Sequence, residues 1–470
     1  MTSEPDPCLL PATELARRMR SKDVSAREVL DAHLERIEAV NPAVNALVTV
    51  TAERAADDAA RADEAILHGE PLGPLHGLPV AHKDLVATAG IRTTAGSPIF
   101  ADAVPEADDL LVERVRAAGA VLVGKTNTPE FGAGSQTFNP VFGATRNPYD
   151  PTKTCGGSSG GAAVALACGM VPIADGSDLG GSLRNPAAFC NVVGFRPSPG
   201  RVPSWPTSNA WQDLSVDGPM GRTVGDVALM LSALAGPDAR VPISLPEPGR
   251  ILAEPLDVDL AAPRVAWAPD AAGTMPFDPR IPPIIDRARD AFVGSGCRIE
   301  EAFPDLRDAR EVFLTMRAHM FASELAELLD DHRHQMKDTL VWNIEEGLRL
   351  TGADLARAEL ARTRLIERVA AFFDRFDFLV MPVTQVVPFD VEVEYPTHID
   401  GSPMATYLDW MESCWCITVT GCPAISVPGG FTDDGLPVGV QIVGRRGDDL
   451  GVLRLAHAFE RETRWGDRHP

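Results

Sequence analysis

The chain has 470 residues, and its 66 Asp and Glu residues against 43 Lys and Arg residues give a formal net charge of −23. An acidic chain without a basic run lacks the surface that displaces counterions from nucleic acid, so we expect no direct nucleic-acid ligand. Hydrophobic residues make up 45% of the sequence and charged residues 23%, which is typical of a folded globular protein and excludes an intrinsically disordered one.

No stretch of about 20 apolar residues is present, and the start, MTSEPDPCLL, has neither a basic segment nor a long apolar one. We therefore expect no membrane association and no export. Of eight scattered cysteines, Cys414, Cys416 and Cys422 cluster, but no second group of Cys or His lies at a zinc-ligand spacing. The expected arrangement is reduced, buried thiols in a cytoplasmic protein without a metal.

In the first quarter of the chain, periodicity predicts helices over residues 12–21 and 25–40. The second begins with a capping box, Ser25 to Glu28, and is expected to end at Asn41-Pro42. From residue 77 onward, short apolar runs predict strands that alternate with helices, which is an α/β pattern. The strands are expected at 78–81, 121–123, 171–174 and 192–195, and the helices at 109–118 and 161–169.

The second half of the chain leaves the strand pattern and then returns to it. Residues 236–283 are expected to form surface connections around one strand at 264–267. Helices are then predicted at 284–294, 308–330 and 352–375, strands at 378–381, 424–427 and 438–443, and a last helix at 449–463. The return of strands predicts one central mixed sheet that is built from both ends of the chain and covered by helices.

The expected organisation is thus a single large α/β domain over residues 1–470, although length alone suggests about three domains. Within it we expect an N-terminal helical region (1–60), a core that carries the motifs (77–235), a mainly helical excursion (284–375) and the return to the sheet (376–470).

Residues 119–126, GAVLVGKT, match the Walker A pattern letter for letter. A phosphate-binding loop needs a strand before the first glycine and a helix that begins at the Lys-Thr. Here the residues between Gly119 and Gly124 are themselves the predicted strand, and Asn127-Thr128-Pro129 does not begin a helix. We therefore interpret the match as accidental.

Two glycine-serine segments are more informative. Residues 155–161, CGGSSGG, lead into a small-residue helix; Ser158 also fits a hydrolase nucleophile elbow, but residues 150–154 make a poor strand before it. In residues 175–187, DGSDLGGSLRNPA, glycines before Ser182 let consecutive backbone N–H groups converge, as an oxyanion hole requires. A flexible connector and a simple turn are the alternatives. Lys83, at the end of an apolar strand, would by itself indicate no function.

In this order, with Ser182 24 positions after Ser158, these segments resemble the amidase signature family. Further landmarks of the resemblance lie at 93–97, 124–127, 142–148, 218–223, 423–428 and 435–441. The resemblance implies the amidase signature fold, with Ser182 as the acylated nucleophile and Lys83 as the base. Ser158 would bridge them, with a cis peptide bond to Gly157.

The resemblance also implies an oxyanion hole and a set of supporting residues. The oxyanion would be bound by the backbone N–H groups of Leu179, Gly180, Gly181 and Ser182, with Gly157, Asp178 and Arg184 in support. Lysine can act as a base only when neutral, which burial favours. No cofactor or metal is implied, and a homodimer is compatible with the family. Lys83, Arg184 and the N–H groups are expected to make the pocket locally electropositive.

The predicted function is hydrolysis of carboxylic amides through an acyl-enzyme, extending to esters and carbamates (urethanes). The alternative is the A subunit of glutamyl-tRNA(Gln) amidotransferase, a glutaminase within a complex. That branch typically has an arginine pair where this chain has Trp342-Asn343, and an acidic residue near Met411. These replacements leave the charges of glutamine without partners, and they favour the stand-alone enzyme. A catalytically dead scaffold is disfavoured because all three triad positions are filled.

The substrate pocket is expected to be lined by aromatic residues from two segments, 201–211 and 407–416. The second contains Trp410, Met411 and Trp415. A bulky apolar or aryl amide would suit such a pocket better than glutamine.

Overall fold

In the computed structural model, which describes residues 6–470, eleven strands form one sheet in the order β1-β3-β2-β4-β6-β5-β12-β13-β9-β7-β8. The strands are β1 (Leu47–Val50), β2 (Pro79–Lys83), β3 (Val121–Thr126), β4 (Ile173–Asp178), β5 (Val193–Arg196), β6 (Val216–Gly221), β7 (Arg264–Trp267), β8 (Arg298–Glu301), β9 (Phe378–Pro382), β12 (Ala424–Phe431) and β13 (Pro437–Gly444). A separate ribbon pairs β10 (His398–Ile399) with β11 (Ser402–Pro403).

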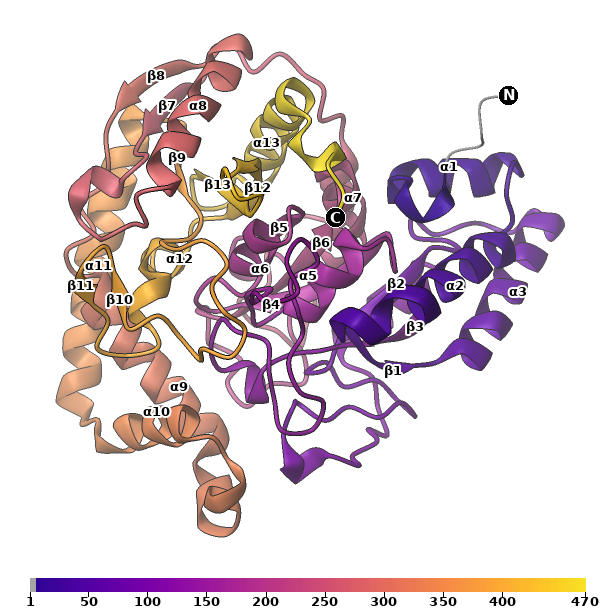
Figure 1. Ribbon diagram of the computed structural model, residues 1–470, viewed down its shortest axis with the longest axis horizontal. Coiled ribbons are helices and arrows are strands. Elements are labelled where there is room, and N and C mark those ends of the chain that lie inside the picture. The colour runs from indigo at the N-terminus through magenta and orange to yellow at the C-terminus, as the bar shows by residue number, and fades with distance from the viewer. Residues whose placement is uncertain (1–5) are drawn as a thin grey trace.

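The sheet is mixed and joins the two ends of the chain. β2 is parallel to β3 and β4, and β7 is parallel to β8 and β9, whereas β12 is antiparallel to both β5 and β13. Figure 1 shows the yellow C-terminal strands β12 and β13 next to the magenta strand β5. The predicted α/β fold, with a central mixed sheet built from both ends of the chain, is confirmed.

Helices cover the sheet along its length. They are α1 (Ala12–Ser21), α2 (Ala26–Val44), α3 (Ala52–His68), α4 (Leu110–Ala117), α5 (Gly160–Ala167), α6 (Arg184–Phe189), α7 (Val224–Leu234), α8 (Ile281–Gly294), α9 (Ala309–His332), α10 (Asp338–Arg349), α11 (Gly352–Arg375), α12 (Glu412–Thr418) and α13 (Asp449–Thr463). Figure 1 shows α1 to α3 beside β1 to β3 at one side of the molecule, while α9 and α10 lie at another.

The predicted end of α2 is wrong. α2 continues through Asn41 and Pro42 to Val44. Pro42 has no N–H to donate to the Glu38 carbonyl, so this helix loses one hydrogen bond near its end and continues for two more residues. The turn is closed by the Asn45 N–H, which donates to the Asn41 carbonyl at 2.8 Å, and the Asn41 Oδ1 accepts from the N–H groups of Ala46 and Leu47.

Other elements were not predicted: α3, α6, α7, α10, α12, β1, β6, β8 and the ribbon of β10 and β11. Two of the strands show why. β6 has the sequence VDGPMG, and glycine with proline normally indicates a loop, yet β6 pairs with both β4 and β5. β8 has the polar sequence RIEE and lies at the edge of the sheet, where three of its four residues are exposed.

The sheet topology brings the predicted motifs to one edge. Because β2 and β4 are parallel neighbours, Lys83 at the end of β2 and Asp178 at the end of β4 lie at the same edge. α5 begins two residues after Ser158, and α6 begins two residues after Ser182. The short loops between strand and helix therefore carry both serines to this edge.

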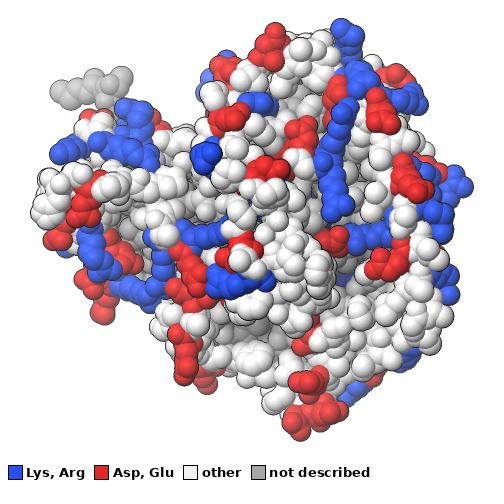
Figure 2. All heavy atoms as spheres, turned by 180° about the vertical axis from the view of Figure 1, so that it is seen from behind, with Lys and Arg blue, Asp and Glu red and all other residues white. Residues whose placement is uncertain are grey.

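The surface carries both signs of charge. On the face shown in Figure 2, basic and acidic side chains are interspersed. Within residues 6–470, no helix combines the length and the apolar character that crossing a bilayer requires.

Candidate active site

The Lys83 side chain is fully buried among three serine hydroxyl groups. Its Nζ donates to the Oγ of Ser158 at 2.6 Å, of Ser177 at 3.0 Å and of Ser159 at 3.1 Å. The contact with Ser158 is the one that the sequence predicts. Ser159 and Ser177 were not predicted as contacts, although Ser159 follows Ser158 directly and Ser177 points to the same face of β4 as Asp175.

Burial lowers the pKa of the Lys83 ammonium to about 7, although the negative charges of Asp217 and Asp175 oppose the shift. Asp175 also fixes the backbone here: its Oδ1 accepts from the Lys83 N–H at 3.0 Å, and its Oδ2 contacts Nδ1 of the buried His82. A substantial fraction of Lys83 is therefore neutral near pH 7, as a general base must be.

The peptide bond between Gly157 and Ser158 is cis. A Cβ atom at position 157 would lie 2.9 Å from Thr137 Oγ1 and 3.1 Å from the backbone nitrogen of Gln136. A side chain at position 157 would force Thr137 and the backbone at Gln136 to shift, which favours the second glycine of the CGGSSGG segment.

The loop from Leu179 to Ser182 connects β4 with the helix α6. Gly181 has a φ of +116°, and its N–H donates to Asp178 Oδ1 at 2.9 Å. Leu179, Gly180 and Ser182 line a cavity, whereas Gly181 does not. Of the four residues whose backbone N–H groups were expected to bind the oxyanion, Gly181 thus uses its N–H on a carboxylate, and the other three line the cavity.

Arg184 and Asp178 form a buried, bidentate ion pair, with Arg184 Nε and Nη2 donating to the two carboxylate oxygens at 2.9 and 2.8 Å. Arg184 also donates to the Cys414 carbonyl, Gln441 Oε1 and Thr418 Oγ1. Burial alone would raise the pKa of Asp178, but Arg184 outweighs it and holds that pKa well below its usual range.

Arg184 does not line the cavity, and its charge is neutralised by Asp178. The expectation that Arg184 makes the pocket electropositive is therefore wrong. A different arginine, Arg317 of α9, brings a positive charge to the cavity wall.

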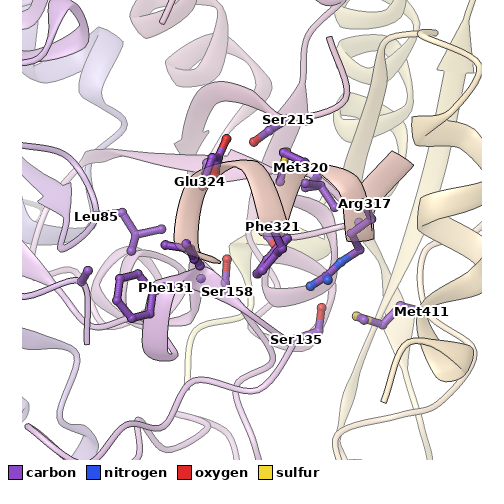
Figure 3. A pocket seen from close by; sticks show the side chains of 18 of the residues that line it. Leu85, Phe131, Ser135, Ser158, Ser215, Arg317, Met320, Phe321, Glu324 and Met411 are labelled. Carbon is purple, nitrogen blue, oxygen red and sulfur yellow. The ribbon is translucent and has the colours of Figure 1, made fainter. Parts of the chain in front are cut away.

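The cavity has a volume of about 280 Å³, and both Ser158 and Ser182 open onto it. Its lining includes apolar side chains from several elements: Leu85, Phe131, Phe313, Met320, Phe321, Leu325 and Met411. Figure 3 shows that α9 lies across this space and that Phe321 is close to Ser158 in this view. The arrangement can place a small apolar substrate against two serines and a set of backbone donors.

Most of the aromatic residues expected at the pocket lie elsewhere. Trp410 and Trp415 are buried in the core, Trp211 is 73% exposed, and only Met411 of the two predicted segments lines the cavity. Trp415 acts indirectly, because its ring stacks at 4.9 Å on Phe313, which does line the cavity.

The sequence reasoning missed the contribution of α9. Phe313, Arg317, Phe321 and Glu324 recur at three- and four-residue intervals, so they share one face of the helix, and that face meets the cavity. The sequence shows the periodicity of these residues, but it does not show that this face of the helix meets the cavity.

The Walker-like segment is a strand, β3, with Gly119 just beyond α4 at a positive φ. Lys125 is buried, and its Nζ contacts the Val86 carbonyl and, at 2.9 Å, Thr88 Oγ1. The match is accidental, as predicted. All eight cysteines are buried free thiols, and in the described part of the chain no group of three or more His, Cys, Asp or Glu residues is placed to hold a metal ion.

The family model described as Amidase matches residues 28–453. The chain belongs to the amidase signature family. It is therefore an amidase, an enzyme that hydrolyses carbon–nitrogen bonds.

Relatives of this amidase match it over nearly the whole chain. An acylamidase from Rhodococcus erythropolis is 38% identical over 465 residues, which cover 98% of this chain and 97% of the relative. The A subunit of glutamyl-tRNA(Gln) amidotransferase from Synechococcus sp. (strain CC9605) is 34% identical over 469 residues, 94% of each chain. The solved structure of a bacterial aryl acylamidase of the amidase signature family superposes with a TM-score of 0.91, at 31% identity, and covers 97% of this chain and 98% of its own.

Replacing Arg184 by methionine should lower the free energy of unfolding by about 3–5 kcal/mol, because Asp178 would remain as a buried charge without its bidentate partner. The measurement is chemical unfolding followed by circular dichroism. The matched control is Arg357→Met, which removes an exposed ion pair with Glu311 and should leave the midpoint nearly unchanged. Equal midpoints for the two variants would contradict the importance of the buried pair.

Proposed function

We propose that this amidase is an acylamidase that cleaves small amides with apolar or aryl groups through an acyl-enzyme on Ser182. One observation carries the proposal: the neutralisable Lys83 amine lies 2.6 Å from Ser158 Oγ, at a cavity onto which Ser182 also opens. The two relatives named as acylamidases support the acyl-transfer chemistry.

In the acylation half of the proposed mechanism, neutral Lys83 takes the proton of Ser158 while Ser158 takes the proton of Ser182. Ser182 Oγ bonds to the carbonyl carbon, and the carbonyl oxygen becomes an oxyanion. When the C–N bond breaks, the proton returns from Lys83 through Ser158 to the departing nitrogen. The amine leaves, and the acyl group stays on Ser182.

Deacylation repeats these steps with water in place of Ser182. Water gives its proton through Ser158 to Lys83 and attacks the ester carbonyl, and the bond to Ser182 Oγ breaks as that oxygen is reprotonated. The acid is released and the enzyme is restored.

The oxyanion of both half-reactions would be stabilised by the backbone N–H groups of Leu179, Gly180 and Ser182. These three residues line the cavity, while the Gly181 N–H is bonded to Asp178. Preorganised donors of this kind lower the barrier because they need no reorientation when the charge develops.

The chemistry of the cavity supports the substrate class. Phe131, Phe313 and Phe321 offer aromatic faces, and about 280 Å³ suits a small aryl amide. Esters and carbamates present the same electrophilic carbonyl to Ser182, so we include them in the proposed range.

Ser182→Ala should lower kcat by roughly 10⁵- to 10⁶-fold, since the variant has no oxygen to acylate. Hydrolysis of 4-nitroacetanilide and labelling by a fluorophosphonate probe measure the effect. Ser323→Ala removes an exposed α9 hydroxyl that bonds only to the His319 carbonyl, and it should retain full activity and labelling. Probe labelling of the Ser182→Ala variant would remove Ser182 as the nucleophile.

The kcat/KM of the enzyme should rise about tenfold per pH unit below pH 7 and level off above it. The reason is that the Lys83 ammonium, with a pKa of about 7, must lose its proton before it can act as a base. A pH series from 5 to 9 tests this expectation. The Lys83→Ala variant should lose most of its activity, and its remaining kcat/KM should no longer rise with pH. A kcat/KM of the wild type that does not change with pH would contradict the hypothesis that Lys83 is the base.

The glutaminase alternative is less well supported by the pocket. Met411 lines the cavity where the amidotransferase branch typically has an acidic residue, so a glutamine ammonium would find no partner there. We expect the purified chain to hydrolyse 4-nitroacetanilide with a kcat/KM at least about 100-fold above that for ammonia release from glutamine. The reverse preference would establish the alternative.

A further inference from the structure

One charged side chain at the cavity has no role in the proposed mechanism. Arg317 of α9 is only 4% exposed and lines the cavity. Its Nη1 donates to Asn343 Oδ1 at 2.6 Å, and the guanidinium lies 4.1 Å from the ring centre of Phe321 and 5.5 Å from that of Tyr407. Among residues 6–470, no carboxylate is close enough to shift its pKa.

Other buried arginines have more acceptors. Arg184 is paired with Asp178 and Arg201 with Asp449, and Arg362 forms a bidentate pair with Asp213. Arg222 has no ion pair in the described part of the chain, but it donates to three backbone carbonyls. A buried cation without a counter-ion is unfavourable, and proteins normally supply one. What Arg317 lacks is an anionic acceptor.

The neighbours of Arg317 supply only neutral acceptors. Asn343 Oδ1 accepts one hydrogen bond, and the Tyr407 hydroxyl is placed to accept another. Burial lowers the pKa of Arg317, and Tyr407 opposes this shift without supplying a full negative charge. Of these three residues Arg317 alone lines the cavity, so an anionic acceptor for its guanidinium would have to come from the cavity.

α9 also shows at which end of the cavity the acceptor would lie. Phe313, Arg317 and Met411 are buried, whereas Glu324, two helical turns beyond Arg317, is exposed to solvent. Arg317 thus lies at the closed end of the cavity and Glu324 at its mouth. In the view of Figure 3 the Arg317 nitrogens lie between Phe321 and Ser135, on the side of the cavity wall opposite Leu85.

We propose that Arg317 binds a carboxylate group of the substrate, so that this enzyme prefers amides that carry an anionic group at the closed end of its cavity. The inference rests on the proposed acylamidase function. A guanidinium can hold a carboxylate with two parallel hydrogen bonds, and its stacking on Phe321 fixes the plane of the fork. The carboxylate of Glu324 at the mouth would repel the same substrate in the reversed orientation.

The substrate carboxylate can belong to the acyl group or to the amine, and two matched pairs of anilides distinguish these sources. For the acyl side we compare glutaranilate with pentananilide, which differ by a terminal carboxylate in place of a methyl group. For the amine side we compare 4-acetamidobenzoate with 4-methylacetanilide. The enzymes are the wild type, Arg317→Met, Arg317→Lys and the exposed control Arg357→Met.

The wild type should prefer the carboxylate member of one pair. Arg317→Met should lower kcat/KM for that member by about 10- to 100-fold, the range expected for a charge-assisted hydrogen bond, and change the neutral member less than about threefold. For that member, the kcat/KM of Arg317→Lys should lie between those of the wild type and Arg317→Met, because lysine keeps the positive charge but cannot form two parallel hydrogen bonds. Inhibition by free glutarate or benzoate, whichever matches the preferred side, should weaken in parallel, and Arg357→Met should match the wild type.

Two results would overturn the inference while leaving the proposed function intact. One is a wild type that labels on Ser182 and hydrolyses both members of each pair equally well. The other is an Arg317→Met variant that loses both members equally, which would indicate a structural role. If no anilide is hydrolysed and Ser182 is not labelled, the proposed function itself fails, and the inference fails with it.

Discussion

The buried ion pair between Asp178 and Arg184 fixes both ends of the loop that carries Ser182, the proposed nucleophile. The two residues flank the loop, one at the end of β4 and one at the start of α6, and Asp178 also accepts from the N–H groups of Gly181 and Leu183. Through Gln441 of β13, and through Cys414 and Thr418 of α12, the same guanidinium ties the loop to the C-terminal part of the chain. The position of Ser182 therefore depends on strands from both ends of the chain being in one sheet.

The same pair influences the proposed base. The negative charges of Asp217, Asp175 and Asp178 all favour the ammonium form of Lys83 and so oppose a fall of its pKa. Burial outweighs these charges, and the pKa falls to about 7. The ion pair that holds the Ser182 loop and the pKa of the proposed base thus share one carboxylate, that of Asp178.

What the sequence predicted well was local. Lys83, Ser158 and Ser182 each lie in a short segment whose glycines or flanking strand indicate its geometry, and the structure places them at one sheet edge. What it missed depends on side-chain placement. Trp410 and Trp415 are in the core because packing against remote elements decides which face of a segment meets the cavity. The Gly181 donor is taken by Asp178, three residues away, because the turn of the loop brings the carboxylate to that N–H.

The groups proposed for catalysis and the groups that would select the substrate come from different elements. The proposed catalytic groups lie on the sheet edge and its loops, while much of the cavity wall opposite them comes from α9, which Asn343 of α10 contacts through Arg317. Relatives with different names are 38% and 34% identical to this chain over nearly its whole length, so overall similarity reports mainly on the shared fold. The cavity wall around Ser158 and Ser182 includes Arg317 and Met411, and we expect a few such side chains, more than the shared fold, to decide the substrate.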